Sequence, residues 1–408
     1  MRVLILSPGT RGDVAPATAL GAAFVADGHE VSIVANREYE RLVTDAGCIL
    51  RPIDASLAPD PASLEGLSKS AGVRAHLTAL RGYMAAAGEV AVSAGKDADV
   101  VLVNTISPYG HDIAEGLGVP SATLMLQPAY PSGDYPPVIA SNVDFGRLGN
   151  RLAGRLAERV PTPYDPVGRR IRAEFGLPPE SRRAGQRRRD RAGVPVHHGI
   201  SPVVLPRPRE WPTHLTLDGF WVPRDQDDWT PPSSLVEFIE DGPTPIVVSL
   251  GSIDPGPTVV EAVADALRDS GIRAILQGGG FQAVAERFDD SQVRHIGPVP
   301  HSWLLPKAAA VVHHAGAGMV SSTLLAGAPS IPMPSHTDQP FWARRLVAIG
   351  AATDPIPWRR ADGSKLAAAI RHVIADQGLR DAARAAGSAM RKEDSTRPLR
   401  TWLQQLSG

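Results

Sequence analysis

The sequence has 408 residues, of which 43% are hydrophobic and 21% are charged, and its formal net charge is -1. At roughly 150 residues per domain, this length and composition predict a globular protein of two or three domains with substantial cores. The near-neutral charge, without a long run of one sign, argues against a nucleic-acid-binding protein.

The sequence carries no pattern for export or for membrane insertion. The apolar run near its start covers only residues 3–6 and is not followed by a cleavage pattern. No stretch reaches the roughly 18 consecutive apolar residues of a spanning helix. The single cysteine, Cys48, excludes an intramolecular disulfide framework. We therefore expect a cytoplasmic protein without stable membrane insertion.

Short apolar runs alternate with alanine-rich or amphipathic stretches over residues 1–126. The runs that predict buried strands cover residues 2–6, 30–36, 49–53, 99–104 and 120–126. The stretches that predict helices cover residues 13–28, 39–47 and 111–118. Strands that alternate with helices indicate a parallel sheet with helices on both faces.

This alternation weakens between residues 127 and 235. Residues 127–137 are rich in proline and glycine and predict a loop. An arginine cluster follows, which fits a solvated helix face, a disordered loop, or a contact with an anionic acceptor or partner. Its members are Arg182, Arg183, Arg187, Arg188, Arg189 and Arg191. Residues 206–235 are dense in proline, tryptophan and aspartate and predict an interdomain linker.

A second alternation occupies the remaining part of the chain. Strands are predicted over residues 244–252, 272–278, 293–297, 309–314 and 330–334. Helices are predicted over residues 258–271, 319–327, 341–350 and 364–407. The whole pattern predicts an α/β protein with two facing, doubly wound domains. Because such sheets bind ligands at the carboxyl ends of their strands, we expect the site in the cleft between the domains.

The stretch "VVHHAGAGM" leads from one of these strands into a helix. Gly316 and Gly318 allow the backbone to approach a ligand closely, and a helix N-terminus offers unpaired N–H donors to an anion. His314 adds a further donor. This pattern predicts a phosphate or diphosphate site, although a tight turn of small residues fits the same letters.

A comparable turn, "SPGTRGDVAP", follows the first predicted strand. Gly9 and Gly12 do not form the G-x-G-x-x-G spacing, and the second strand ends at Asn36 rather than at an acid, so a nicotinamide dehydrogenase is disfavoured. Asp13 fits a helix N-cap, with Pro16 in the first turn, and it also fits a general base at the edge of the cleft.

Six motifs occur in a recognisable order: "GTRGDVAP", "DGFW", "VVSLGS", "GPVPH", "HHAGAGM" and "TDQPFWA". In this order the chain resembles the inverting GT-B glycosyltransferases that act on vancomycin-type glycopeptides, on polyketides and, more distantly, on sterols. The resemblance is weakest over residues 55–95 and 130–195. It implies an acceptor-binding domain, a linker, a donor-binding domain and a C-terminal helix that crosses back to the first domain. The corresponding ranges are 1–205, 206–235, 236–385 and 386–408.

The resemblance also implies a donor site that no single motif contains. In it, Gly251, Ser252 and the loop of His314 lie near the diphosphate, Val299 and His301 near the base and ribose, and Asp338 and Gln339 near the sugar hydroxyls. A carboxylate and an amide offer the acceptors and donors that a polyol needs. The remaining residues expected on the donor side are Thr10, Arg11, Gly12, Ala315, Gly316, Ala317, Gly318 and Met319. Met319 departs from the family, which usually has a serine or threonine there.

By the same resemblance, Asp13 is the general base. An ordinary aspartate is a weak base at pH 7, but burial in the cleft would raise its pKa. Retaining relatives of this fold commonly carry Glu-x7-Glu in the second domain, whereas this chain has no glutamate between Glu286 and Glu393. We therefore expect inversion without a metal or cofactor, with a dTDP- or UDP-linked sugar as co-substrate.

The acceptor is expected to be a hydrophobic small molecule bound by the first domain. Its candidate contacts are Met84, Tyr109, Gln127, Tyr130 and Asp134, although methionine and aromatic residues fit a hydrophobic core equally well. Two other functions remain open at this point. One is a nucleotide-sugar epimerase of the same fold, and the other is an inactive auxiliary protein, which Met319 alone favours.

Overall fold

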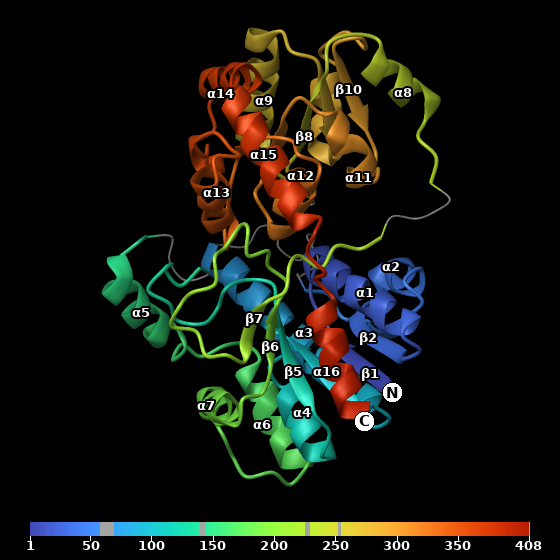
Figure 1. The fold of residues 1–408 in the computed structure, drawn as a ribbon, viewed down its shortest axis with the longest axis vertical. Coiled ribbons are helices and arrows are strands. Elements are labelled where there is room, and N and C mark those ends of the chain that lie inside the picture. Colours follow the sequence, from blue (N-terminus) through green and yellow to red (C-terminus); the bar gives the residue numbers. More distant parts are fainter. Residues whose placement is uncertain (58–68, 139–142, 225–228, 252–253, 408) are drawn as a thin grey trace.

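A computed structural model describes residues 1–57, 69–138, 143–224, 229–251 and 254–407 of the chain. They form two α/β units, which lie one above the other in Figure 1, and each is built on a parallel sheet. This arrangement confirms the predicted fold class. The predicted helices and strands recur with small shifts at their ends, except that residues 364–407 form three helices rather than one and that one strand lies in the predicted linker.

The first unit is built on a seven-stranded sheet in the order β3-β2-β1-β4-β5-β6-β7. Its strands are β1 (Arg2–Leu6), β2 (Glu30–Asn36), β3 (Ile49–Ile53), β4 (Val100–Asn104), β5 (Ser121–Met125), β6 (Val196–His198) and β7 (Leu215–Leu217). Every residue of β4 is buried. Such a strand lacks polar alternation because helices cover both faces of the sheet.

Helices cover this sheet on its two faces and along its edges. They are α1 (Arg11–Ala26), α2 (Glu40–Thr44), α3 (Lys69–Gly95), α4 (Gly110–Leu117), α5 (Gly146–Ala157), α6 (Asp165–Glu174) and α7 (Arg182–Ala192). One hydrophobic cluster joins the sheet to α1, and a second joins its other face to α3, α4 and α6. Both clusters are needed because alternate side chains of a strand point to opposite faces.

The second unit has a five-stranded sheet in the order β10-β9-β8-β11-β12. Its strands are β8 (Ile246–Ser249), β9 (Ala274–Gln277), β10 (Val293–Ile296), β11 (Val311–His313) and β12 (Ser330–Pro332). Its helices are α8 (Ser233–Glu240), α9 (Pro257–Ser270), α10 (Gln282–Ala285), α11 (His301–Leu304), α12 (Ala317–Leu325), α13 (Gln339–Ala348), α14 (Gly363–Ala375) and α15 (Gln377–Met390).

Strand β7 lies inside the stretch that the sequence predicted to be an interdomain linker. It pairs in parallel with β6, with Val196 opposite Leu215, and completes the first sheet. The chain therefore leaves the first unit about ten residues later than predicted. A strand of three residues among prolines has too few positions to show an alternating pattern.

The two units share a buried hydrophobic cluster. It includes Trp211 and Val204 of the first unit and Phe341 and Trp342 of the second. Across the same interface Arg345 donates from Nε to the carbonyl oxygen of Val204 at 2.8 Å. These contacts bring the carboxyl ends of the two sheets toward each other.

The last helix, α16 (Arg397–Ser407), returns to the first unit, as Figure 1 shows by its position beside α1 and β1. Leu399 and Leu403 are fully buried in the cluster that contains α1. Arg400 donates from Nε to Asp27 Oδ2 at 2.6 Å. The predicted crossing of the C-terminal helix is thereby confirmed. No helix of the described residues is both long and apolar enough to cross a membrane.

Candidate active site

Asp13 lies at the start of α1, beside the carboxyl end of β1. Its Oδ2 accepts hydrogen bonds from the backbone N–H of Thr10 at 2.9 Å and from Thr10 Oγ1 at 3.2 Å. Thr10 is thus the N-cap, and Asp13 is the third residue of the helix rather than the cap predicted from the sequence. The two residues form a reciprocal capping pair, which holds the carboxylate in one orientation.

Burial raises the pKa of Asp13 to about 6, against two opposing hydrogen bonds from Thr10. The negative charge of Asp338, on the second unit, raises this pKa further. Arg11 and Gly12, which the sequence also assigned to the site, are exposed beside Asp13 on the first turn of α1. A carboxyl group with a pKa near the working pH is well suited to accept a proton.

The turn that carries Asp13 is fixed by hydrogen bonding to Tyr83 of α3. The Tyr83 hydroxyl accepts a hydrogen bond from the backbone N–H of Gly9 at 2.7 Å and donates one to Asn36 Oδ1. Gly9 has φ of +125°, and a Cβ atom there would collide with the Asp13 carboxylate and with Ile106. Only glycine at this position therefore allows the turn, the Asp13 carboxylate and the Ile106 side chain to pack so closely.

His314 directly follows β11 in the second unit, at the carboxyl end of that strand. Its imidazole packs closely against Gly251 and Gly316. A Cβ atom added to these glycines would lie 3.0 Å and 2.5 Å, respectively, from the nearest atom of the ring. Burial lowers the pKa of His314 to about 4, so the ring is neutral at pH 7. Its Nδ1 is buried, and a backbone contact with Ser249 opposes this fall in the pKa.

The loop after His314 presents the first turn of α12 to the cleft. Gly316 is the N-cap, and the first intrahelical bond runs from Val320 N to Gly316 O at 3.0 Å. The amides of Ala317 and Gly318 are therefore free of intrahelical bonds, as the first donors of any helix are. Ala315 has φ of 60°, a left-handed conformation that costs energy for an alanine. This turn matches the predicted anion-binding loop.

Met319 is oriented differently from the other members of this loop. Its side chain is buried in a hydrophobic cluster with Leu235, Phe238 and Leu304. The residue thus contributes packing between α8, α11 and α12, and its side chain does not cover the free amides of the loop.

Asp338 and Gln339 lie at the start of α13, and both side chains are largely buried and already hydrogen-bonded. Asp338 Oδ2 accepts from Trp342 Nε1 at 2.7 Å, one helical turn away. Gln339 Oε1 accepts from the backbone N–H of Ser335 at 2.8 Å, which fixes the preceding loop. The charge of Asp338 acts on Asp13 of the first unit and on His314 of the second, so these three side chains lie near one another.

Side chains at the carboxyl ends of β8 and β9 and at the start of α11 form a hydrogen-bonded group. His301 Nε2 lies 3.1 Å from Gln277 Oε1, which also accepts from Ser249 Oγ at 3.1 Å. Val299 is half-buried, contacts the cluster around Met319 and lines a groove beside β10. Ser252, predicted near the diphosphate, lies outside the described residues.

A largely apolar cavity of about 350 Å³ opens in the first unit at the carboxyl ends of β4 and β5. Two of the five predicted acceptor contacts, Gln127 and Tyr130, line this cavity. Thr105 and Pro108 line it as well, and Ile106 between them approaches the turn of Asp13 through Gly9. The cavity therefore lies near the turn of Asp13, although Asp13 itself does not line it.

The other three predicted acceptor contacts lie elsewhere. Met84 and Tyr109 are buried in the core between α3, α4 and the sheet, and neither lines the cavity. Asp134 pairs with Arg147 of α5 and does not line the cavity either. For Met84 and Tyr109, the alternative of core packing holds, because the helical period turns both side chains toward the sheet.

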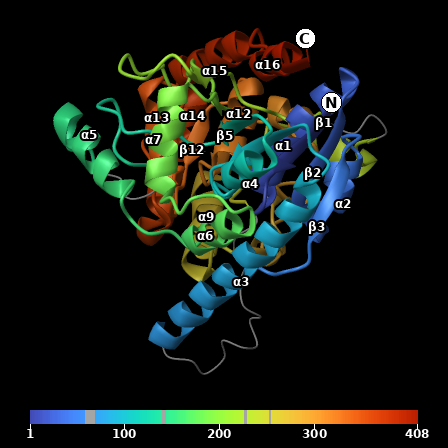
Figure 2. The ribbon, with the colours of Figure 1, turned by 90° about the horizontal axis from the view of Figure 1, so that it is seen from below.

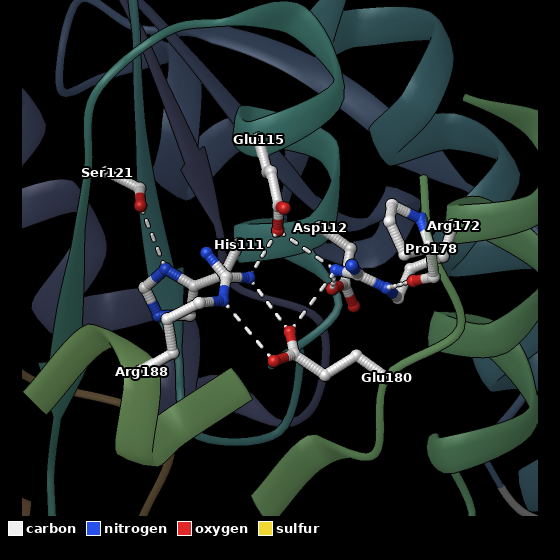
Figure 3. A network of polar contacts seen from close by, with 8 residues as sticks. All are labelled: His111, Asp112, Glu115, Ser121, Arg172, Pro178, Glu180 and Arg188. Carbon is white, nitrogen blue, oxygen red and sulfur yellow. Dashed lines mark hydrogen bonds and ion pairs between the residues drawn. The ribbon is translucent and has the colours of Figure 1, made fainter. Parts of the chain in front are cut away.

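The arginine cluster is part of an ordered helix, α7, and its members are not equivalent. Figure 3 shows Arg188 bridging Glu115 and Glu180, at 2.6 and 2.8 Å, beside the buried Arg172. Arg182 pairs with Asp165 at 3.0 Å and lines the cavity together with Arg189. The cluster is thus neither a disordered loop nor a wholly solvated helix face.

Three residues that support the site were not singled out from the sequence. Gln277 ends a predicted strand, and Trp342 follows Asp338 by four residues on a helix, so both positions carried a usable signal. Tyr83 lies within a long helix, and nothing local distinguishes it from a core residue.

Known proteins share both halves of this arrangement. Residues 3–132 match the Glycosyltransferase family 28 N-terminal domain, and residues 281–405 match the Erythromycin biosynthesis protein CIII-like, C-terminal domain. An O-mycaminosyltylonolide 6-deoxyallosyltransferase of Streptomyces fradiae is 32% identical over 414 residues, which cover 96% of this chain and 94% of that protein. The chain belongs to the antibiotic-type glycosyltransferases.

Other relatives of this glycosyltransferase are more distant. A sterol 3-beta-glucosyltransferase of Arabidopsis thaliana is 28% identical, and the match covers 97% of this chain and 64% of that protein. The solved glycotransferase of kitacinnamycin is 18% identical, with a TM-score of 0.70 over 99% of this chain and 98% of that one. VinC in complex with dTDP is 20% identical, with a TM-score of 0.67 over both whole chains. These structures confirm the GT-B fold.

Proposed function

We propose that this glycosyltransferase moves a sugar from a dTDP- or UDP-linked donor to a hydroxyl group of a hydrophobic natural product, with inversion at the anomeric carbon. Asp13 accepts the proton of that hydroxyl while its oxygen bonds to the anomeric carbon. The bond from this carbon to the diphosphate oxygen breaks on the opposite side, and the diphosphate leaves with the electron pair.

The observation that carries this proposal is that two unlike groups, one on each unit, both lie near Asp338. On the first unit is a carboxyl group whose pKa burial raises to about 6. On the second unit is a helix N-terminus with free amides beside the neutral imidazole of His314. The first group suits proton removal, and the second suits a leaving group that gains negative charge.

The donor assignment is supported by the chemistry of the second unit. Backbone amides and the α12 dipole favour a diphosphate, and a neutral imidazole can donate a hydrogen bond to one of its oxygens. The relatives VinC, SsfS6 and SpnG have been solved with thymidine diphosphate. These complexes support a dTDP-linked sugar as the first donor to test.

The acceptor assignment is supported by the cavity in the first unit. Its walls include Met125, Tyr135, Val138 and Val196, which offer an apolar surface, while Gln127 offers hydrogen bonds. Its position beside the turn of Asp13 would hold an acceptor hydroxyl near the base. The S. fradiae relative, by its name, transfers 6-deoxyallose to O-mycaminosyltylonolide, which supports a small-molecule acceptor.

The auxiliary-protein alternative rests on Met319, which lacks the hydroxyl that the family usually has there. Its side chain packs in a hydrophobic cluster, and the backbone amides of the loop can bind a diphosphate without that hydroxyl, which supports the enzyme. Inversion is supported by the absence of glutamate between Glu286 and Glu393, where retaining relatives of this fold commonly carry a Glu-x7-Glu element.

The proposal is tested by titration calorimetry with dTDP and UDP, followed by product analysis. We expect binding of at least one nucleotide, and a transferred sugar whose anomeric configuration, read by NMR, is opposite to that of the donor. Retained configuration would contradict the inverting mechanism. An epimerised sugar from donor alone would identify an epimerase, and no nucleotide binding would identify an auxiliary protein.

A further inference from the structure

Helix α5 carries a stripe of exposed apolar side chains. Leu148, Leu152 and Leu156 are 81%, 59% and 49% exposed, and their spacing of four residues places them on one face. Phe145 and Val160, at 53% and 59%, extend this face at its two ends. Figures 1 and 2 show α5 at the margin of the molecule in both views.

This exposure is concentrated rather than scattered. The described residues include ten large hydrophobic side chains that are exposed, and six of them lie between residues 143 and 160. Single exposed apolar residues are ordinary on a protein surface, whereas a contiguous group on one helix indicates a contact surface.

The helix itself is firmly attached through its opposite face. Asn150 is buried, accepts from the backbone N–H of Phe145 at 3.0 Å and donates to the carbonyl oxygen of Gly133 at 3.3 Å. Gly154 packs so closely that a Cβ atom there would lie 2.9 Å from Pro131 Cα. The stripe therefore faces outward because the other face is docked.

Arginines recur every four residues along one edge of the stripe, at 147, 151, 155 and 159. Arg147 and Arg151 pair with Glu210, whereas Arg155 and Arg159 are exposed and form no ion pair with a described residue. The surface is thus apolar with a basic margin. A second copy of the same surface would bring arginine against arginine, which disfavours self-association.

We propose that α5 is a membrane-surface helix, which lies in the plane of an anionic lipid bilayer with its leucine stripe in the boundary between headgroups and acyl chains. Apolar residues on one face and arginines beside them are the features of such interfacial helices. Anionic headgroups complement the arginines that lack a protein partner. The helix lies on the membrane and does not cross it.

The position of α5 also links this surface to the cavity. Asn150, Gly154 and Ala157, on its docked face, line the cavity near the turn of Asp13. A hydrophobic acceptor dissolved in the bilayer would thus have a short path to the cavity. This consequence rests on the proposed function, whereas membrane binding itself does not.

Vesicle co-sedimentation of the whole chain tests the proposal without donor or acceptor. We expect binding to vesicles of phosphatidylcholine and phosphatidylglycerol in equal parts, weaker binding to phosphatidylcholine alone, and release by salt. Leu148→Gln with Leu152→Gln should weaken binding on the order of thirtyfold, from the loss of two buried leucines. Arg155→Glu with Arg159→Glu should remove the preference for anionic vesicles.

The matched control is Leu406→Gln, at a 37% exposed leucine on α16, which should bind vesicles as the wild type does. Circular dichroism checks that each variant is folded. Absence of vesicle binding by the wild type, or equal binding by the leucine variant, would overturn the proposal. A dimer seen by sedimentation velocity would also overturn it, if the leucine variant abolishes that dimer and the wild type binds no vesicles. The stripe would then be the surface that contacts a second copy of the chain.

Discussion

Replacing Asp13 by asparagine separates its role as a base from its role in the fold. The amide oxygen of the new side chain can still accept from Thr10 N, so the capping pair at the start of α1 remains. The change removes only the ionisable group. We therefore expect a folded protein that binds nucleotide as the wild type does but turns over slowly.

The magnitude follows from the pKa of Asp13. Burial raises it from 3.8 to about 6, which corresponds to up to about 3 kcal/mol of free energy that disfavours the ionised carboxylate in the folded state. Because the folded-state pKa lies above the unfolded value, the wild type loses this stability as the pH rises from about 4 to 6. The asparagine variant does not titrate. It should be more stable than the wild type at pH 7 by up to about 3 kcal/mol, and this difference should vanish below pH 4.

Urea unfolding at pH 3.5 and pH 7 measures this difference, and steady-state kinetics measures turnover. We expect kcat to fall on the order of a hundredfold or more, with the nucleotide Kd unchanged. Asp97→Asn is the control, since Asp97 is a 78% exposed carboxylate far from the cleft. Near-wild-type turnover by Asp13→Asn would refute the assignment of the base, and an unchanged stability at pH 7 would refute the buried, raised-pKa carboxylate.

Two further predictions concern the donor loop and the C-terminal helix. His314→Ala should weaken nucleotide binding on the order of tenfold by calorimetry, from loss of one hydrogen-bond donor, with His372→Ala, exposed on α14, as the unaffected control. Because His314 is neutral above a pKa of about 4, the loss of affinity caused by His314→Ala should be the same at pH 6 and at pH 8, and a loss that is tenfold larger at pH 6 would contradict the neutral ring. Leu403→Ala should lower the free energy of unfolding by roughly 2–5 kcal/mol, since this leucine is fully buried between α16 and the first unit. Leu406→Ala on the same helix should change it by less than about 0.5 kcal/mol, and equal effects of both changes would show that α16 is not docked as described.

How far the sequence predicts a feature of this protein depends on how local that feature is. The alternation of strand and helix patterns predicted two parallel sheets, because hydrophobic periodicity is a property of consecutive residues. The same pattern predicted the strand-to-helix turns at Gly316 and at Asp13, and the structure has both turns. Strand β7 was not predicted, because three residues among prolines are too few to show an alternating hydrophobic pattern.

The side chains of one segment were harder to assign to a face. Met319 follows the loop glycines directly, yet its side chain packs against α8 and α11. Met84 and Tyr109 have the composition of a hydrophobic binding site, yet they fill the core beneath the sheet. The rotation of a helix about its axis is set by what packs against it, and those partners lie far away in the sequence.

The sequence by itself thus determined the two-sheet architecture, the order of the motifs and the residue types that meet at the strand ends. Only the tertiary structure decided their chemical states. Burial raises the pKa of Asp13, and the charge of Asp338 on the second unit adds to that rise. Burial also lowers the pKa of His314, whose ring packs against Gly251 of a different segment. Burial and facing charges are properties of contacts between distant segments, and they exist only once the two units have come together.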